Sequence, residues 1–193
     1  MMSWNFFKTI YMQFKSNPIL SVLSIILAWY CLVFSGDLSI DLSTYGIDIP
    51  ITMQSLAVLI IGGLLGPYVS LVAVVLYIFS GVTGFTTFAN NAYGLSVLYG
   101  KTGGFLIAFI PAAFFIGWFN NPKTEASTWQ TGMGILVASL IILLLGYLRL
   151  LKFLDWEIAF TKGILPFLPG ALVKGFIAFV TLSMVNRVLK ARA

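Results

Sequence analysis

Six long apolar segments alternate with shorter polar stretches along the chain. They cover residues 18–35, 50–66, 68–83, 101–119, 129–150 and 164–186. Each approaches the roughly 17–25 residues that a helix needs to cross the hydrocarbon core of a bilayer. The second and third segments are short and meet at Gly66-Pro67, a dipeptide that ends one helix and starts another. The pattern therefore predicts an all-α integral membrane bundle of about six transmembrane helices, with residues 1–193 as a single transmembrane domain.

The composition agrees with lipid as the solvent for most of the surface. Hydrophobic residues make up 60% of the 193 residues and charged residues only 9%, whereas a soluble domain carries about 25% charged residues. Too few polar side chains are present to cover a surface in water. We therefore expect a multi-pass protein of the cell membrane that is surrounded by the lipid bilayer.

The basic residues predict the orientation of the bundle. Residues 1–17 set aromatic side chains against lysines, which predicts an amphipathic segment at the cytoplasmic interface or, alternatively, an extension of the first span. The Lys/Arg-rich face of a membrane protein is cytoplasmic, so both termini are expected in the cytoplasm and three longer loops outside. The basic residues of the cytoplasmic face are Lys8, Lys15, Lys123, Arg187, Lys190 and Arg192, and the outer loops are 36–49, 84–100 and 150–163, the last as a short amphipathic helix.

Several kinds of chemistry are excluded by what the sequence lacks. The chain has no histidine, which excludes histidine acid–base catalysis and histidine metal sites. The apolar segments contain no acidic residue, so an intramembrane enzyme is not expected. Cys31 is the one cysteine, so no internal disulfide can form. The basic residues are dispersed, so no nucleic-acid partner is expected, and neither is a cofactor or a metal.

Lys174 is a positive charge within the last apolar segment. Pro169 can occupy a first helical position, where its missing N–H is not needed, and Lys174 then lies about five residues into the helix. A cation is costly at this depth in lipid, so it must face a partner, a wet cavity or the interface. Two interpretations stay open. Lys174 contacts an anionic ligand group, helped by the positive end of the helix dipole, or it extends to the outer interface.

Two polar stretches beside the predicted outer loops could line a pocket. In the first, Thr52 and Gln54 either line that pocket, or Thr52 caps a helix and Gln54 makes an interhelical hydrogen bond. In the second, residues 84–104, asparagine amides stand beside aromatic rings, which suits a small, flat ligand with a polar edge; the alternative is an ordinary polar loop. The candidate ligand-binding residues are Gln54, Phe88, Asn90, Asn91, Tyr93, Tyr99 and Lys174.

Small residues mark one face of the first segment. Ser24 and Ala28 are four positions apart, so they lie on the same side of a helix. Small residues at this spacing let two helix backbones approach closely. They predict a contact either within the chain or with a partner membrane protein.

Seven stretches follow one another in the order of a known family. They are Pro50-Ile-Thr-Met-Gln-Ser-Leu-Ala-Val-Leu59, Leu65-Gly-Pro67, Val75-Leu-Tyr77, Gly81-Val-Thr-Gly-Phe85, Phe88-Ala89, Gly100-Lys-Thr-Gly-Gly-Phe105, and Leu165-Pro-Phe-Leu-Pro-Gly170 with Lys174. Together they resemble the BioY family, the biotin-binding membrane S-components of energy-coupling factor (ECF) transporters. Lys174 matches the lysine of the family's Pro-Gly-Asp-x-x-Lys motif. The chain departs from the family at Ala171, where the motif has its acid, at Asn90-Asn91, where the loop is usually glycine-dominated, and at Lys101, where proline is common.

The resemblance implies about six helices in a bacterial cell membrane and an outward-facing vitamin pocket. It also implies partners on the cytoplasmic side, namely an ECF transmembrane coupling protein and two ATPase subunits. The implied function is the capture of biotin for import, with the biotin carboxylate at Lys174 and the ureido edge at the asparagines or tyrosines of the 84–104 stretch. Because Ala171 replaces the acid, the alternative is an S-component-like subunit that binds another small anionic vitamin.

Overall fold

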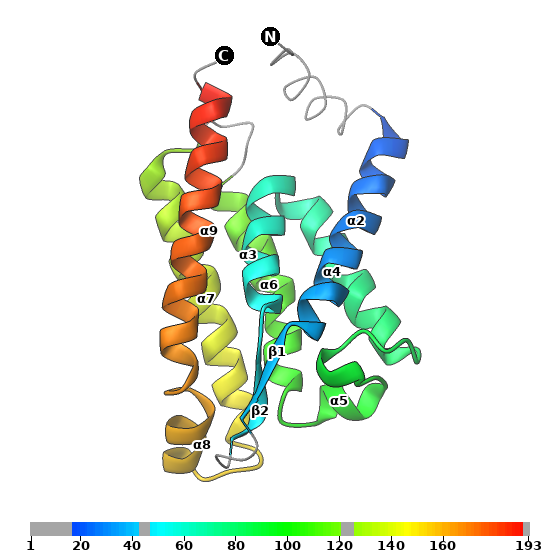
Figure 1. Cartoon of the computed structure of the whole chain (residues 1–193), viewed down its shortest axis with the longest axis vertical. Coiled ribbons are helices and arrows are strands. Elements are labelled where there is room, and N and C mark those ends of the chain that lie inside the picture. Colours follow the sequence, from blue (N-terminus) through cyan, green and yellow to red (C-terminus); the bar gives the residue numbers. More distant parts are fainter. Residues whose placement is uncertain (1–16, 43–46, 121–125, 191–193) are drawn as a thin grey trace.

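A computed structural model describes residues 17–42, 47–120 and 126–190, so nearly all of the predicted N-terminal segment lies outside the described residues. Within them, long helices form a bundle in which α2 begins and α9 ends at the same end (Figure 1). A β-hairpin and shorter helices gather at the opposite end. The elements are α2 (Pro18–Asp37), β1 (Ser39–Leu42), β2 (Ile47–Thr52), α3 (Gln54–Leu65), α4 (Pro67–Val82), η2 (Ala89–Asn91), α5 (Leu95–Tyr99), α6 (Gly103–Phe119), α7 (Thr128–Leu150), α8 (Trp156–Gly163) and α9 (Phe167–Lys190).

The long helices occupy the predicted apolar segments. Helices α2, α7 and α9 are each long and apolar enough to cross a membrane, by length and composition. Helices α3, α4 and α6 are apolar but shorter, with 12, 16 and 17 residues. Large side chains such as Leu23 and Phe176 are more than half exposed on the outside of the bundle, as expected of a surface that lipid covers. The prediction of a helical membrane bundle is confirmed, and so is the short helix between residues 150 and 163, which is α8.

The hairpin is the part of the fold that the hydrophobic pattern does not predict. Strands β1 and β2 pair antiparallel, with Ser39 opposite Thr52. The pattern predicts a helix from residue 50, whereas α3 begins only at Gln54. Pro50 lacks an N–H and disfavours a helical conformation in the residue before it, and the β-branched isoleucines on either side favour a strand. These residues therefore extend the outer loop into a strand before the helix starts.

The Gly66-Pro67 junction ends α3 and begins α4, as the sequence predicts. Gly66 has a φ of 79°, a left-handed conformation that glycine adopts readily, and Pro67 is the first residue of α4. Because Pro67 has no N–H, it cannot donate to the Gly63 carbonyl four residues earlier. The Asn120 side chain donates to that carbonyl instead, with 2.9 Å between Nδ2 and the oxygen.

Asn120 belongs to a buried polar cluster at the end of the bundle away from the hairpin. Its Oδ1 accepts hydrogen bonds from the Thr131 hydroxyl at 2.6 Å and from the Asn186 Nδ2 at 2.8 Å. All three side chains are at most 8% exposed. The cluster therefore joins the end of α6, the first turn of α7 and the last turns of α9, and its links satisfy polar groups that would be costly to bury alone.

Ser24 and Ala28 face the interior of the chain. They are 6% and 3% exposed, on a helix that packs against α3 and α4. The Ser24 hydroxyl donates to the Leu20 carbonyl of its own helix at 2.7 Å. The pair thus packs within the chain, which is the first of the two expected alternatives, and a contact with a partner membrane protein stays a prediction.

Candidate ligand-binding site

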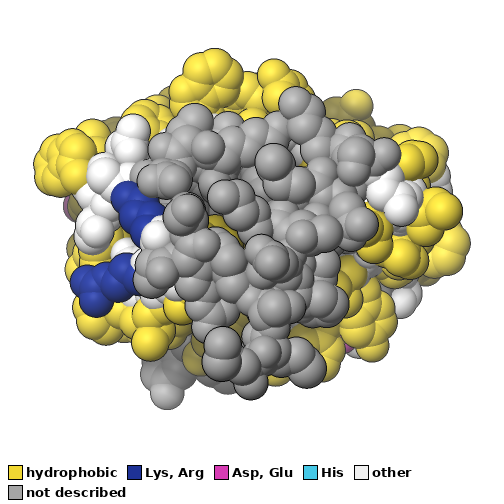
Figure 2. Space-filling model, turned by 90° about the horizontal axis from the view of Figure 1, so that it is seen from above, with side chains coloured by type: hydrophobic (Ala, Val, Ile, Leu, Met, Phe, Trp, Pro, Cys, Tyr) yellow, Lys and Arg dark blue, Asp and Glu magenta, His cyan; other side chains and the backbone are white. Residues whose placement is uncertain are grey.

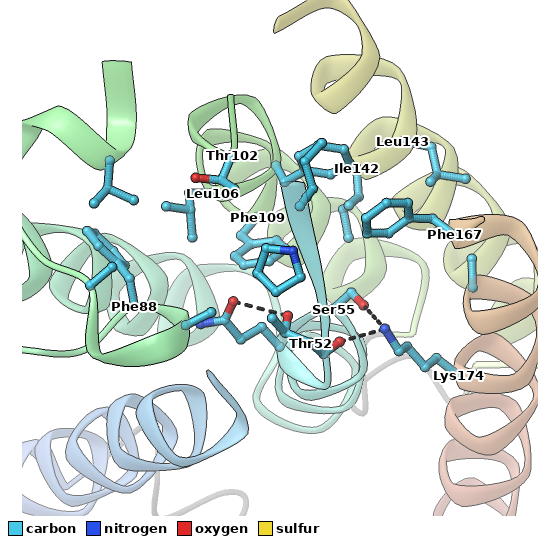
Figure 3. Close-up of a pocket in the computed structure, with 18 of the residues that line it drawn as sticks. Thr52, Ser55, Phe88, Thr102, Leu106, Phe109, Ile142, Leu143, Phe167 and Lys174 are labelled. Carbon is cyan, nitrogen blue, oxygen red and sulfur yellow. Dashed lines mark hydrogen bonds between the residues drawn. The ribbon is translucent and has the colours of Figure 1, made fainter. Parts of the chain in front are cut away.

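A cavity of about 330 Å³ lies in the half of the bundle that carries the hairpin (Figure 3). Side chains from β2, α3, α6, α7 and α9 and from the segment around η2 and α5 surround it. Most of the lining is apolar, with a few polar groups, which is the usual character of a small-molecule site. The aromatic lining residues are Phe88, Phe105, Phe109 and Phe167, and the polar ones include Thr52, Gln54, Ser55, Asn90, Thr102, Ser139 and Lys174.

Lys174 points into the bundle toward the cavity (Figure 3). Its side chain is only 8% exposed, and its ammonium donates to the Thr52 carbonyl at 2.6 Å and to the Ser55 hydroxyl at 3.2 Å. This geometry differs from the alternative in which Lys174 extends to the outer interface. An ammonium has three donors, so the two bonds leave one N–H for a ligand.

The start of α9 lies earlier than the sequence predicts. The helix begins at Phe167, so Pro169 is its third residue rather than its first. Proline is tolerated there because none of the first four helical N–H groups has a partner within the helix. Lys174 is therefore the eighth helical residue, beyond the first turn in which the helix dipole acts. The hydrogen-bond partners, rather than the dipole, account for how the ammonium is held.

The positive charge of Lys174 has no acidic neighbour in the wall of the cavity. Among the described residues that line it, none is aspartate or glutamate. Ala171 lines the cavity one turn before Lys174 on the same helix and adds only a methyl group. A buried cation is stable only with a compensating partner, so this cavity favours a ligand that carries its own negative charge.

Gln54 combines both of the roles that the sequence leaves open. It lines the cavity, and it also bonds between helices, because its Nε2 donates to the Tyr77 hydroxyl on α4. Its Oε1 accepts from the Thr52 hydroxyl at 3.2 Å. Thr52 does not cap α3, since the N-cap residue is Met53 and makes no side-chain cap bond. The expectation that Thr52 caps the helix is therefore wrong.

The outer segment between α4 and α6 contributes only some of its candidate residues to the cavity. Phe88, which is 2% exposed, and Asn90 line it, and the Asn90 Oδ1 accepts from the Ser39 hydroxyl of β1 at 2.9 Å. Asn91 is exposed and does not belong to the lining. Neither do Tyr93 and Tyr99, which are 57% and 69% exposed. Ligand contacts by these three residues stay predictions.

Arg149 holds the end of α5 against α7. Its Nε donates to the Gly100 carbonyl at 3.2 Å, and its Nη2 donates to the Tyr99 carbonyl. The guanidinium also lies 5.2 Å from the ring centre of Phe153. Because Gly100 lines the cavity, Arg149 anchors one edge of the site from outside it.

Some lining residues are not among the sequence candidates. Ser55 binds the ammonium of Lys174, and the Phe167 ring stacks on Phe105 with 5.6 Å between ring centres. One signal could have identified Phe167. Positions 167, 171 and 174 follow the spacing of one helix face, so the face that carries Lys174 also carries this ring. The sequence offers no comparable signal for Ser55, whose contact depends on how β2 leads into α3.

The polar groups of the cavity fall into two regions. Gln54, whose amide bonds the tyrosine behind the Phe88 ring, and Asn90 offer amide groups, and Lys174 and Ser55 offer donors on the side of Phe167 (Figure 3). Thr52 links the two regions at the cavity wall, because its hydroxyl donates to Gln54 and its carbonyl accepts from Lys174, and apolar side chains make up most of the remaining lining. The arrangement suits a compact molecule with a hydrogen-bonding edge at one end, an apolar middle and an anionic group at the other end.

Comparison with known proteins identifies relatives of the chain. A sequence model of the BioY family matches residues 11–191. The probable biotin transporter BioY of Pyrococcus horikoshii is 33% identical over 132 residues, which cover 68% of this chain and 77% of that protein. The biotin transporter BioY of Thermotoga maritima is 33% identical over 135 residues, which cover 67% and 76%.

A solved structure has a similar fold. The crystal structure of the S-component for biotin from an ECF-type ABC transporter matches with a TM-score of 0.78. The match covers 89% of this chain and 93% of that one, at 20% sequence identity. At this identity the likeness supports the arrangement of the helices.

Proposed function

The chain belongs to the BioY family, and from this premise we propose that it is the substrate-binding membrane subunit that captures biotin for import by an ECF-type transporter. The observation that carries the proposal is the inward-facing ammonium of Lys174 in an otherwise largely apolar cavity. The relatives are named as a probable biotin transporter and a biotin transporter, so we propose transport rather than catalysis. Their names also favour biotin over another anionic vitamin.

In the proposed complex, the two polar ends of biotin meet the two polar regions of the cavity. The carboxylate accepts from the free N–H of Lys174 and from Ser55, and such charge-assisted bonds are roughly twice as strong as neutral ones. The ureido group meets the amides of Gln54 and Asn90. The apolar ring and chain lie against the aromatic walls. A cavity of about 330 Å³ is near the lower end of the range for small-molecule sites, about 300–1,000 Å³, as suits a compact vitamin.

We propose that the hairpin end of the bundle faces outside and that both termini are cytoplasmic. Arg187 and Lys190 lie in the last turn of α9, and Figure 2 shows basic side chains at that end of the molecule. Basic residues near the ends of spans favour the cytoplasmic side. The sequence has no nucleotide-binding motif, so ATP hydrolysis needs partners. A transmembrane coupling protein and two ATPase subunits are the proposed set.

The test is equilibrium binding to the purified protein in detergent, together with mass spectrometry of the ligand that co-purifies. We expect biotin to bind one molecule per chain. Biotin carboxamide, which lacks the negative charge, should bind about 10-fold more weakly or worse, because a hydrogen bond to a charged group contributes about 1.5–3 kcal/mol. Tighter binding of another vitamin in the same assay would contradict the proposal.

A further inference from the structure

We infer that Tyr77 is a positioning residue for ligand recognition, which acts from behind the cavity wall by fixing the amide of Gln54. The inference rests on the proposed function. Tyr77 lies on α4, is fully buried and is not itself part of the lining. Any effect on a bound ligand must therefore pass through the side chains that it touches.

Two hydroxyl groups hold the Gln54 amide from opposite sides. The Nε2 donates to the Tyr77 hydroxyl, and the Oε1 accepts from the Thr52 hydroxyl at 3.2 Å. A free glutamine amide can rotate through two-fold positions that exchange its donor and its acceptor. Both hydroxyls can donate as well as accept, so the two bonds hold the plane of the amide and the places of its two polar atoms at the cavity wall.

The backbone of α2 packs closely against the same amide. A Cβ atom at Gly36 of α2 would lie 2.8 Å from the Gln54 Nε2, so only the absence of a side chain lets α2 approach this closely. Gln54 is 3% exposed, and water has little access to compete for the Tyr77 bond. A bond shielded in this way is costly to leave unmade.

Tyr77 also supports a second lining residue at the same end of the cavity. Its ring meets the Phe88 ring edge to face, with 5.6 Å between the centres and an interplanar angle of 79°. Gly81, one turn further along α4, makes room for that ring, because a Cβ there would lie 2.3 Å from the Phe88 Cζ. The hydroxyl of Tyr77 thus binds Gln54, and its ring packs against Phe88. A substitution that removes only the hydroxyl therefore separates the two roles.

The experiment is a double-mutant cycle on biotin affinity with Tyr77→Phe and Gln54→Met. Tyr77→Phe keeps the ring against Phe88 and removes only the hydroxyl. We expect it to weaken biotin binding about 3- to 10-fold, the range for one hydrogen bond, in the chain that retains Gln54. In the Gln54→Met background the same change should alter the affinity less than about 2-fold, because no amide is left to orient.

A second cycle provides the matched control. Tyr77→Phe is combined with Arg149→Met, which acts at the edge of the cavity that includes Gly100. These two effects should multiply, since the hydrogen bonds of Arg149 go to the Gly100 and Tyr99 carbonyls, outside the Tyr77–Gln54–Thr52 chain. If Tyr77→Phe only reduced the stability of the fold, it would weaken biotin binding to the same extent in both cycles. Thermal unfolding of each variant measures that loss of stability directly.

The outcomes separate this inference from the proposed function. If the unsubstituted chain does not bind biotin, the proposed function fails. If it binds and Tyr77→Phe leaves the affinity unchanged, or weakens it equally with and without Gln54, the positioning role is overturned. If Tyr77→Phe does not fold, Thr52→Val removes the other hydroxyl that holds the amide. If the losses of biotin affinity caused by Thr52→Val and by Gln54→Met multiply in the double variant, the inference is also overturned.

Discussion

The ammonium of Lys174 donates to the carbonyl oxygen of Thr52 across 2.6 Å, although the two residues are 122 positions apart in the chain. Thr52 is the last residue of β2, and Lys174 lies in the third turn of α9. The contact therefore joins the hairpin to the last helix at the wall of the cavity. A carbonyl has no net charge, so the contact orients the ammonium without neutralising it. The charge remains available to an anionic ligand.

Replacing Lys174 with methionine tests this role. Methionine keeps an unbranched apolar chain but removes the charge, and we expect biotin affinity to fall by about 1.5–3 kcal/mol, the range for a charged hydrogen bond. Isothermal titration of the purified variants gives the dissociation constants. Lys162→Met is the matched control, because Lys162 is exposed on α8. An unchanged dissociation constant for Lys174→Met would reject the role given to this residue.

Arg149→Met should loosen the edge of the cavity without removing a lining side chain. Two carbonyls at the end of α5 lose their donors, so the segment 95–102 should open more often. We expect faster biotin dissociation and an affinity loss of about 0.5–1.5 kcal/mol, as for ordinary hydrogen bonds that are partly exposed. Hydrogen exchange of this segment and the release rate of labelled biotin are the measurements. Lys152→Met, an exposed position three residues later, should change neither.

The sequence predicts the helices better than the directions of their side chains. Length and hydropathy suffice to locate the six main helices of the bundle, three of which are long enough to cross a membrane. The hairpin is missed because β2 runs from the outer loop into residues 50–52, which the hydrophobic pattern assigns to the start of the apolar segment. For Lys174, the inward direction depends on the rotation of α9 about its axis, which packing against other helices sets.

Local backbone conformation explains why the outer segment is the hardest part of the site to predict. Asn90 and Asn91 have φ values of 58° and 55°, in the left-handed region that asparagine tolerates better than most residues. Two consecutive residues in this region turn the chain sharply. Residue type alone suggests that Asn90, Tyr93 and Tyr99 act together, whereas only Asn90 among them lines the cavity.

Asn120→Leu should destabilise the protein while leaving biotin affinity nearly unchanged. The substitution removes partners from the Gly63 carbonyl, Thr131 and Asn186. Each buried polar group left unpaired costs about 1–3 kcal/mol, so a total loss of about 2–4 kcal/mol is expected after partial rearrangement. Unfolding in mixed detergent measures it. Thr181→Val is the control, since that hydroxyl bonds only within its own helix. A large loss of biotin affinity would show that this end of the bundle is coupled to the cavity.

The orientation of the bundle can be tested on intact cells with single cysteines. The one native cysteine, Cys31, is first replaced by alanine. Thr128→Cys and Lys152→Cys then place a thiol just inside the start of α7 and just beyond its end, at positions that are exposed in the structure. The 23 residues of α7 extend about 35 Å at 1.5 Å per residue, enough to separate the two positions by the bilayer.

We expect a membrane-impermeant maleimide to label Lys152→Cys on intact cells and Thr128→Cys only after the membrane is permeabilised. The reason is that Arg187 and Lys190 lie at the end of the bundle where α7 begins, and basic residues near span ends favour the cytoplasm. Labelling of both variants after permeabilisation is the control for reactivity. The reverse pattern on intact cells would place the cavity on the cytoplasmic side and contradict a subunit that captures its ligand from outside.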